Sequence, residues 1–217
     1  MSLTRDLPLD PERAALLFVD VQNFSAHRDG GDFKDLSDED VETRYGGFFR
    51  ALESEVIPNM QRLQRACREA GVEVMYTTIE SLTLDGRDRS LDYKITGFNV
   101  PKGSWDGRVI DALAPGEDEI VLPKSSSSVF ISTHIDYVLR NLGVRQLAIS
   151  GLLTDQCVES AIRDACDLGY LVTQVTDACA TYTADRQAAS LNAIKGYCRQ
   201  VDTATLVDEL RARPPGT

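Results

Sequence analysis

A cysteine that follows a short apolar segment is the residue of this chain with the clearest chemical potential. Residues 147–153 read Leu-Ala-Ile-Ser-Gly-Leu-Leu, which is typical of a strand, and residues 158–168 carry apolar side chains at helical spacing. Cys157 would therefore lie near a helix N-terminus, where free backbone N–H groups and the helix dipole favour negative charge. We expect a lowered pKa, a partly ionised thiol near neutral pH, and N–H groups that could hold an oxyanion. The alternative is a small, buried core cysteine.

Two charged residues follow other apolar segments and could serve the same reaction. Asp20 interrupts the apolar run of residues 14–21, and Lys124 comes directly after residues 119–123. If these segments are parallel strands, Asp20, Lys124 and Cys157 all lie at strand carboxyl ends, where open α/β sheets bind ligands. Cys157 could attack as a thiolate, Asp20 could carry the proton, and Lys124 could balance their charges. Taken singly, Asp20 could cap a loop and Lys124 could be a solvated surface charge.

Apolar segments alternate with helical patterns along the chain, as in a doubly wound α/β protein. The segments expected to be strands are residues 14–21, 72–79, 119–123, 146–150, 170–176 and 198–202. Helices are expected over residues 48–70, before Gly143, after Cys157, and over residues 184–197 and 203–211. Connections of this length suit parallel pairing. We therefore predict one α/β domain over residues 1–217: a Rossmann-like, mostly parallel six-stranded sheet with helices on both faces.

Two long stretches have no clear period. Residues 24–47 are polar and contain four glycines, so we expect a long loop, and Pro58 indicates that the next helix begins or bends there. Residues 80–118 carry aromatic and basic side chains, and we expect this stretch to form a lid or wall over a pocket. Pro214-Pro215-Gly216 predicts an irregular tail.

Composition narrows the class of protein. The net charge of −11 argues against nucleic-acid and anionic-membrane partners, and no apolar run is long enough to span a bilayer. The first ten residues lack the order of a signal peptide, and the cysteines are odd in number without a CxxC pair, so we expect a reduced, cytoplasmic setting. The two histidines are far apart, and we predict neither a metal nor another cofactor.

Several residues near the predicted strand ends could bind a substrate. Asn23 and Glu80 could bind an amide or ureido group, and Arg87, together with Arg89, could clamp a carboxylate. Interleaved acids could instead pair these arginines on the surface. The aromatic residues that could line a pocket, or equally well belong to the core, are Phe24, Tyr93, Trp105 and Phe130.

The chain resembles the isochorismatase-like cysteine hydrolases, a group that includes nicotinamidases, N-carbamoylsarcosine amidase, and ureidoacrylate and biuret hydrolases. The matching segments are Phe-Val-Asp-Val-Gln-Asn-Phe at 18–24, Leu-Pro-Lys at 122–124 with Ser-Val-Phe at 128–130, and Gly-Leu-Leu-Thr-Asp-Gln-Cys-Val at 151–158. Their order and spacing agree with the family from about residue 14 to residue 210.

The resemblance implies roles for particular residues. It assigns Asp20, Lys124 and Cys157 as a catalytic triad, a cis peptide bond between Leu152 and Leu153, and the N–H groups of Leu153 and Cys157 as the oxyanion hole. It also implies a homo-oligomer. Nicotinamidases bind zinc through an aspartate and histidines after the second strand. This chain has Glu80-Ser81-Leu82 in that region, so neither zinc nor nicotinamide is expected.

These observations favour a cysteine amidohydrolase that acts through a thioester on a small amide, carbamoyl or ureido compound, including compounds that bear a carboxylate. Isochorismatases proper cleave a vinyl ether without a cysteine nucleophile, and Cys157 therefore favours C–N cleavage. The alternatives are a nicotinamidase, an isochorismatase-type ether hydrolase, or an inactive interaction protein with the same fold.

Overall fold

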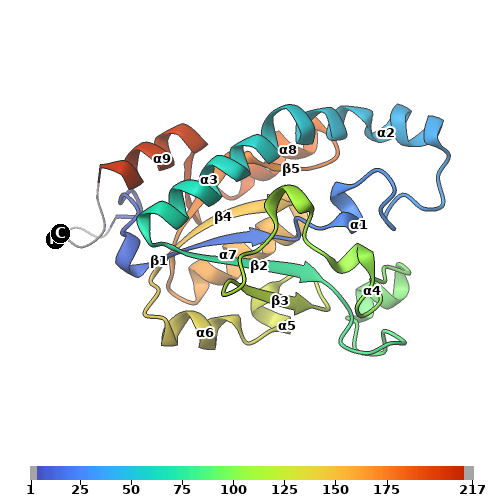
Figure 1. Ribbon diagram of the computed structural model, residues 1–217, viewed down its shortest axis with the longest axis horizontal. Helices are drawn as coiled ribbons and strands as arrows, with labels where there is room; N and C mark the ends of the chain where they lie inside the picture. Colours follow the sequence, from blue (N-terminus) through green and yellow to red (C-terminus); the bar gives the residue numbers. More distant parts are fainter. Residues whose placement is uncertain (1–3, 213–217) are drawn as a thin grey trace.

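The sheet has the predicted class and topology in a computed structural model that describes residues 4–212. Six parallel strands lie in the order β3-β2-β1-β4-β5-β6 (Figure 1). Their bounds are β1 Ala14–Val19, β2 Glu73–Ile79, β3 Ile120–Lys124, β4 Gln146–Leu152, β5 Leu171–Ala180 and β6 Arg199–Val201. The direction of strand order reverses between β1 and β4, which is where doubly wound sheets bind ligands. The predicted tail at Pro214–Gly216 lies outside the described residues.

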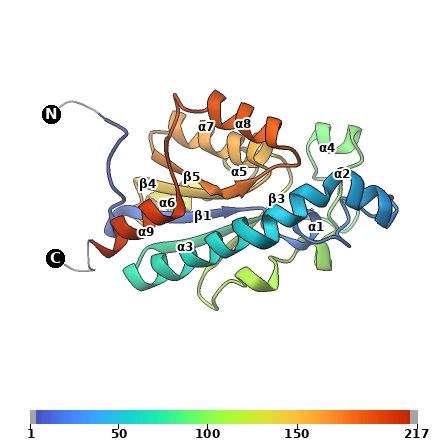
Figure 2. The same cartoon turned by 90° about the horizontal axis from the view of Figure 1, so that it is seen from above.

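Helices cover both faces of the sheet (Figure 2). Side chains of β1 alternate between two cores: Leu16 and Phe18 pack beneath α3 and α9, whereas Leu17 faces the core under α5, α6 and α7. The helices are α1 Asn23–Ala26, α2 Asp38–Ala51, α3 Ile57–Ala70, α4 Leu91–Ile95, α5 Val129–Ser132, α6 Ile135–Asn141, α7 Glu159–Asp167, α8 Ala184–Ala193 and α9 Thr203–Arg211. Within residues 4–212, none of them combines the length and the apolar character that crossing a bilayer requires.

The prediction of a long loop over residues 24–47 is wrong, because α1 and most of α2 lie there. Ser37 caps α2 by accepting a hydrogen bond from the backbone N–H of Asp40, and acidic residues fill the first turn. Phe48 and Phe49 are buried against the core. Capping and burial therefore outweigh the low helix propensity of the paired glycines at 46 and 47.

Pro58 lies in the first turn of α3, which begins at Ile57, so the helix begins next to this proline as predicted. A π-helical segment, Leu52–Val56, joins α2 directly to α3, so that one rod crosses the face of the sheet and projects beyond it (Figure 1). Proline has no N–H to donate to the preceding turn, and a local widening of the helix just before it accommodates that loss. The irregularity that the sequence places at Pro58 is thus absorbed one turn earlier.

The stretch of residues 80–118 first forms a wall at the carboxyl ends of the strands and then, after Ile110, returns to the start of β3 at the opposite end of the sheet. It contains α4 and two short 3₁₀ turns, Trp105–Gly107 and Asp111–Leu113. β5 is longer than the strand predicted over residues 170–176: it runs to Ala180, with a register shift between Ile149 and Gly151 of β4. This extension brings the end of β5 beside the end of β4.

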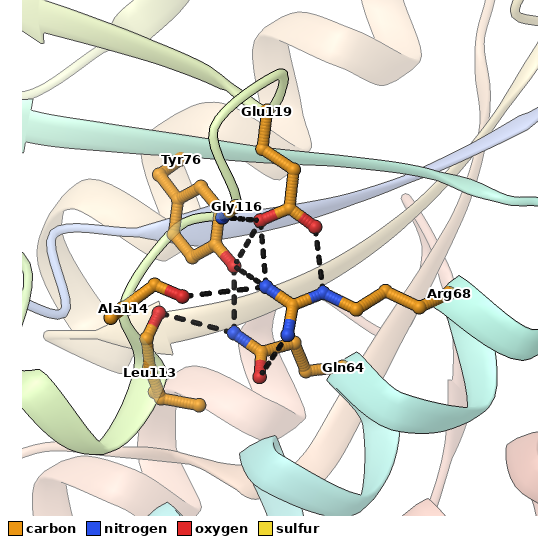
Figure 3. Close-up of polar contacts among 7 residues, drawn as sticks. All are labelled: Gln64, Arg68, Tyr76, Leu113, Ala114, Gly116 and Glu119. Carbon is orange, nitrogen blue, oxygen red and sulfur yellow. Dashed lines mark hydrogen bonds and ion pairs between the residues drawn. The ribbon is translucent and has the colours of Figure 1, made fainter.

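A polar network fastens α3 to the opposite end of the sheet (Figure 3). The guanidinium group of Arg68 donates to both carboxylate oxygens of Glu119 at 2.7 and 2.8 Å. The Tyr76 hydroxyl donates to Glu119 at 3.0 Å and accepts from Gln64 at 2.7 Å. Burial acts to raise the pKa of Glu119, but hydrogen bonds from Arg68, the Gly116 N–H and Tyr76 together hold it below its ordinary value.

We expect Glu119→Gln to lower the free energy of unfolding at neutral pH by about 1–3 kcal/mol, since Arg68 loses its charged partner. The folded-state pKa of Glu119 lies below the ordinary 4.5, so its contribution is complete above that pH and is lost as the pH falls through the folded-state value. The difference in the free energy of unfolding between wild type and Glu119→Gln, measured by urea titration, should therefore decrease as the pH is lowered toward about 3. Glu117→Gln, an exposed neighbour, is the control. An equal difference in the free energy of unfolding at neutral pH and at about pH 3 would contradict this account.

Candidate active site

The cysteine lies at the junction of β4 and α7. After Leu152 the chain passes through a cis peptide bond to Leu153 and then a π-helical turn, Thr154–Val158, before α7 begins. The side chain of Cys157 is almost fully buried, with 4% of its surface exposed. The cysteine in the turn that follows β4 is thus held inside the protein.

Lys124 and Asp20 meet this cysteine. The ammonium nitrogen Nζ of Lys124 lies 3.3 Å from Cys157 Sγ and 2.8 Å from Asp20 Oδ2. The same nitrogen donates to the Ser126 carbonyl at 2.8 Å, and Thr77 Oγ1 donates to Asp20 Oδ1 at 2.9 Å. The three side chains expected at the ends of β1, β3 and β4 are therefore in contact.

The backbone at Asp20 helps to bring its carboxylate to this cluster. Asp20 has a φ of +53°, in the left-handed region that residues other than glycine seldom adopt. Its N–H donates to the Thr77 carbonyl of β2 at 3.0 Å. Backbone conformations of this kind persist where the surrounding structure holds them, and they are frequent at functional sites.

The expectation of a lowered cysteine pKa is wrong in direction. Burial raises the pKa of the Cys157 thiol, the positive charge of Lys124 lowers it, and the net shift is upward. Burial would lower the pKa of Lys124, but the negative charge of Asp20 raises it overall. The resting site is therefore a neutral thiol beside a buried ion pair, because burial outweighs the helix N-terminus.

A pocket of about 450 Å³ opens onto Cys157. The wall of residues 80–118 supplies one side of it, and the ends of β1, β4 and β5 supply another. The lining residues are Asp20, Ser25, Asp32, Ile79, Asp92, Tyr93, Thr96, Phe98, Ser127, Leu152, Leu153, Gln156, Cys157 and Tyr182. Its volume suits a small molecule.

Of the eight residues predicted to bind substrate, Tyr93 lines this pocket. Its hydroxyl oxygen lies 4.0 Å from Cys157 Sγ, and burial raises its pKa, so that the hydroxyl stays protonated. Phe24 lies behind the wall and packs edge-on against Phe98, with 4.7 Å between ring centroids. The Phe98 ring in turn packs against the Tyr93 ring, with 4.8 Å between their centroids.

Asn23, Glu80 and Trp105 hold the wall in place and are not among the lining residues. The side-chain amide of Asn23 donates to the Trp105 carbonyl at 3.0 Å, and Glu80 accepts from the Gly103 N–H at 2.5 Å. The indole ring of Trp105 packs edge-on against His27, and 43% of the residue is exposed. The Asn23 amide and the Glu80 carboxylate are thus hydrogen-bonded to backbone groups of the wall.

The remaining three candidates, Arg87, Arg89 and Phe130, lie elsewhere. Arg87 pairs with Asp85 at 2.9 Å on the surface, and its side chain is 72% exposed. Arg89 donates to the carbonyls of Gly86 and Phe98. Phe130 packs near Tyr170 with 6.1 Å between centroids. No arginine is among the residues that line the pocket, so the arginine clamp for a carboxylate has no counterpart there.

Sequence reasoning missed several lining residues. Tyr182 follows β5, and the rule that ligands bind at strand carboxyl ends would have selected it had β5 been extended to Ala180. Ser127 lies in the serine run after β3, and Gln156 directly precedes the cysteine. Asp32 lies in the stretch interpreted as a loop, and nothing in its local sequence points to the site.

Gly151 sets the distance between the two strands that carry the site. Its φ is +142°, and a Cβ atom there would lie 2.1 Å from the Val19 carbonyl oxygen, next to Asp20. We expect Gly151→Ala to cost at least about 3 kcal/mol in urea unfolding, because neither backbone can move aside. Gly47 in α2 has open space around its Cα, so Gly47→Ala should stabilise the protein by about 0.5–1 kcal/mol. Equal effects of the two substitutions would refute the packing argument.

A parallel α/β sheet that presents a thiol and a carboxylate to one pocket, with a buried ammonium group in contact with both, is the arrangement expected of a cysteine hydrolase. A family model described as the isochorismatase domain matches residues 14–205. The chain therefore belongs to the isochorismatase family of hydrolases, as its motifs suggest. Within residues 4–212, no group of three or more His, Cys, Asp or Glu side chains is arranged to hold a metal ion.

Solved structures agree with this assignment. A cysteine hydrolase from Pseudomonas syringae pv. phaseolicola has a TM-score of 0.81 and 25% identity, with 95% of this chain and 96% of that chain covered. An isochorismatase family protein from Burkholderia thailandensis has a TM-score of 0.72 and 22% identity, with 95% and 100% covered. N-carbamoylsarcosine amidase from Thermoplasma acidophilum has a TM-score of 0.67 and 24% identity, with 88% of this chain and 96% of that chain covered. The latter two support the fold.

Proposed function

We propose that this protein is a cysteine amidohydrolase that cleaves the C–N bond of a small amide, carbamoyl or ureido compound through a thioester on Cys157. The observation that carries the proposal is the contact of one buried ammonium nitrogen with both the thiol sulfur and a carboxylate, at 3.3 and 2.8 Å. A thiol is a strong nucleophile once ionised, and this cluster supplies a base and a compensating charge.

The first half of the reaction transfers the acyl group to sulfur. Asp20 accepts the thiol proton, and the thiolate of Cys157 adds to the carbonyl carbon. The N–H groups of Leu153 and Cys157, two residues of the pocket lining, would hold the oxyanion, and each such donor contributes about 3 kcal/mol. Collapse of the adduct breaks the C–N bond, and Asp20 returns its proton to the departing ammonia or amine.

The second half hydrolyses the thioester. A water molecule gives a proton to Asp20 while its oxygen adds to the acyl carbon. The C–S bond then breaks, the acid leaves, and the proton on Asp20 restores the thiol. Lys124 stays protonated throughout, since its pKa is raised, and it balances whichever of Asp20 and Cys157 carries the negative charge.

An ammonia-release assay over a panel of small primary amides, carbamates and ureides tests this function. The wild-type protein should release ammonia from at least one class, and Cys157→Ala should abolish release. Cys166→Ala is the matched control. Cys166 is also a free cysteine, but it lies on α7 and does not line the pocket. Ammonia release that survives Cys157→Ala would refute the proposal.

A further inference from the structure

The pocket beside Cys157 has a surplus of negative charge. Among residues 4–212, the side chains that line it include three carboxylates, those of Asp20, Asp32 and Asp92, and no lysine, arginine or histidine. Lys124 lies behind this lining and neutralises Asp20 through its ion pair. The charges of Asp32 and Asp92 have no such partner among the lining residues. A substrate that bears a carboxylate would therefore meet repulsion, and a cationic substrate would meet attraction.

Asp32 is held in a fixed position within this pocket. The Tyr182 hydroxyl donates a hydrogen bond to Asp32 Oδ2, and the Asp32 N–H donates to the Phe24 carbonyl at 3.2 Å. Burial raises the pKa of Tyr182, which keeps its hydroxyl protonated as the donor. Among residues 4–212, no hydrogen bond or ion pair links Asp32 to the catalytic cluster. Asp32 is thus a second polar point in the same pocket.

Arg186, which packs against Tyr182, is paired with another carboxylate. The guanidinium group of Arg186 lies over the Tyr182 ring, 5.4 Å from its centroid. Its Nε atom lies 2.5 Å from Asp155 Oδ2, and Arg186 is not among the lining residues. Tyr93, Phe98 and Ile79 give the pocket apolar surface as well. A ligand with an apolar middle and a polar end would match both features.

We propose that Asp32, oriented by Tyr182, binds an ammonium group of the substrate, so that the enzyme acts on small amides carrying an amine and not on those carrying a carboxylate. The chemistry at the other end of the substrate rests on the proposed amidase function. The charge preference is a property of the pocket itself and can be measured separately.

The separate measurement uses thiol reagents that differ in charge. Cys157 is modified with 2-aminoethyl and with 2-sulfonatoethyl methanethiosulfonate, and the rate at each cysteine is followed by peptide mass. The ratio of cationic to anionic rate at Cys157 is divided by the same ratio at Cys166, which corrects for the charge of the whole protein. We expect a normalised ratio of roughly ten, falling at least about threefold in Asp32→Asn. Asp35→Asn removes an exposed charge from the same segment and should leave the ratio unchanged.

The second measurement uses amides of one chain length that end in an amino, hydroxyl or carboxyl group. The amino amide should have the highest kcat/KM, and Asp32→Asn should raise its KM about tenfold with little change in kcat. Tyr182→Phe should act in the same direction with a smaller effect, because Asp32 loses its orienting donor.

The two measurements separate the two claims. If none of the amides is hydrolysed while the rate ratio depends on Asp32, the amidase function fails and the ammonium site stands. The ammonium site is overturned if the normalised ratio at Cys157 is near one, or if Asp32→Asn leaves it unchanged. It is likewise overturned if the carboxyl amide is the best substrate.

Discussion

Asp20→Asn should lower kcat/KM for any amide that the protein hydrolyses by about 10²–10⁴-fold, the range typical of a lost general acid–base. Burial keeps the Cys157 thiol protonated at rest, so a base must remove its proton when substrate arrives. Lys124 contacts both that thiol and Asp20, and Asp20 is the carboxylate of this cluster. An asparagine side chain fills the same space but cannot take up the proton.

Initial rates across a substrate series measure this loss, and circular dichroism establishes that the variant remains folded. Asp85→Asn is a suitable control, because Asp85 lies on the surface and pairs with Arg87. A kcat/KM within about threefold of wild type for Asp20→Asn would show that another group carries the proton.

Lys124→Met should cost about 3–5 kcal/mol of stability, the penalty typical of breaking a buried ion pair. Lys124 is 0% exposed, and its removal leaves the Asp20 carboxylate buried without its cation. Methionine keeps most of the apolar volume of the lysine chain, so the loss reports mainly on charge. The double variant Asp20→Asn, Lys124→Met removes both charges and should be more stable than Lys124→Met alone.

Urea unfolding of the two single variants and the double variant forms a double-mutant cycle that measures the coupling. Strictly additive effects would mean that the 2.8 Å contact between Lys124 and Asp20 contributes no net interaction energy. A cost below about 1 kcal/mol for Lys124→Met would contradict the account, because that is the range of exposed pairs.

The contact of Asp20, Lys124 and Cys157 could be predicted because local sequence patterns indicate where strands end. Three apolar runs ended at Asp20, Lys124 and just before Cys157, and parallel pairing of those runs brings their ends to one edge. The pKa of Cys157 could not be predicted in the same way. It depends on burial by segments far away in sequence, such as the wall that carries Tyr93, and burial outweighs the local helix terminus.

The residues that line the pocket were harder to predict for the same physical reason. An exposed polar side chain and one that fastens a loop look identical in sequence, and Asn23 and Glu80 both bond to backbone groups of the wall. Asp32 reaches the pocket from the non-helical segment between α1 and α2, where it bonds to the Phe24 carbonyl and to Tyr182, a contact that its local sequence does not indicate. The homo-oligomer and the cytoplasmic setting remain predictions.

The central claim is that Cys157 becomes acylated during turnover. The direct measurement is acid quenching of the wild-type protein in the first turnovers of an amide that it hydrolyses, followed by peptide mass analysis. The account predicts a transient adduct with the mass of the acyl group on the peptide that contains Cys157, which disappears as substrate is exhausted. Product formation with no acyl adduct on Cys157, or with the adduct on another residue, would contradict it.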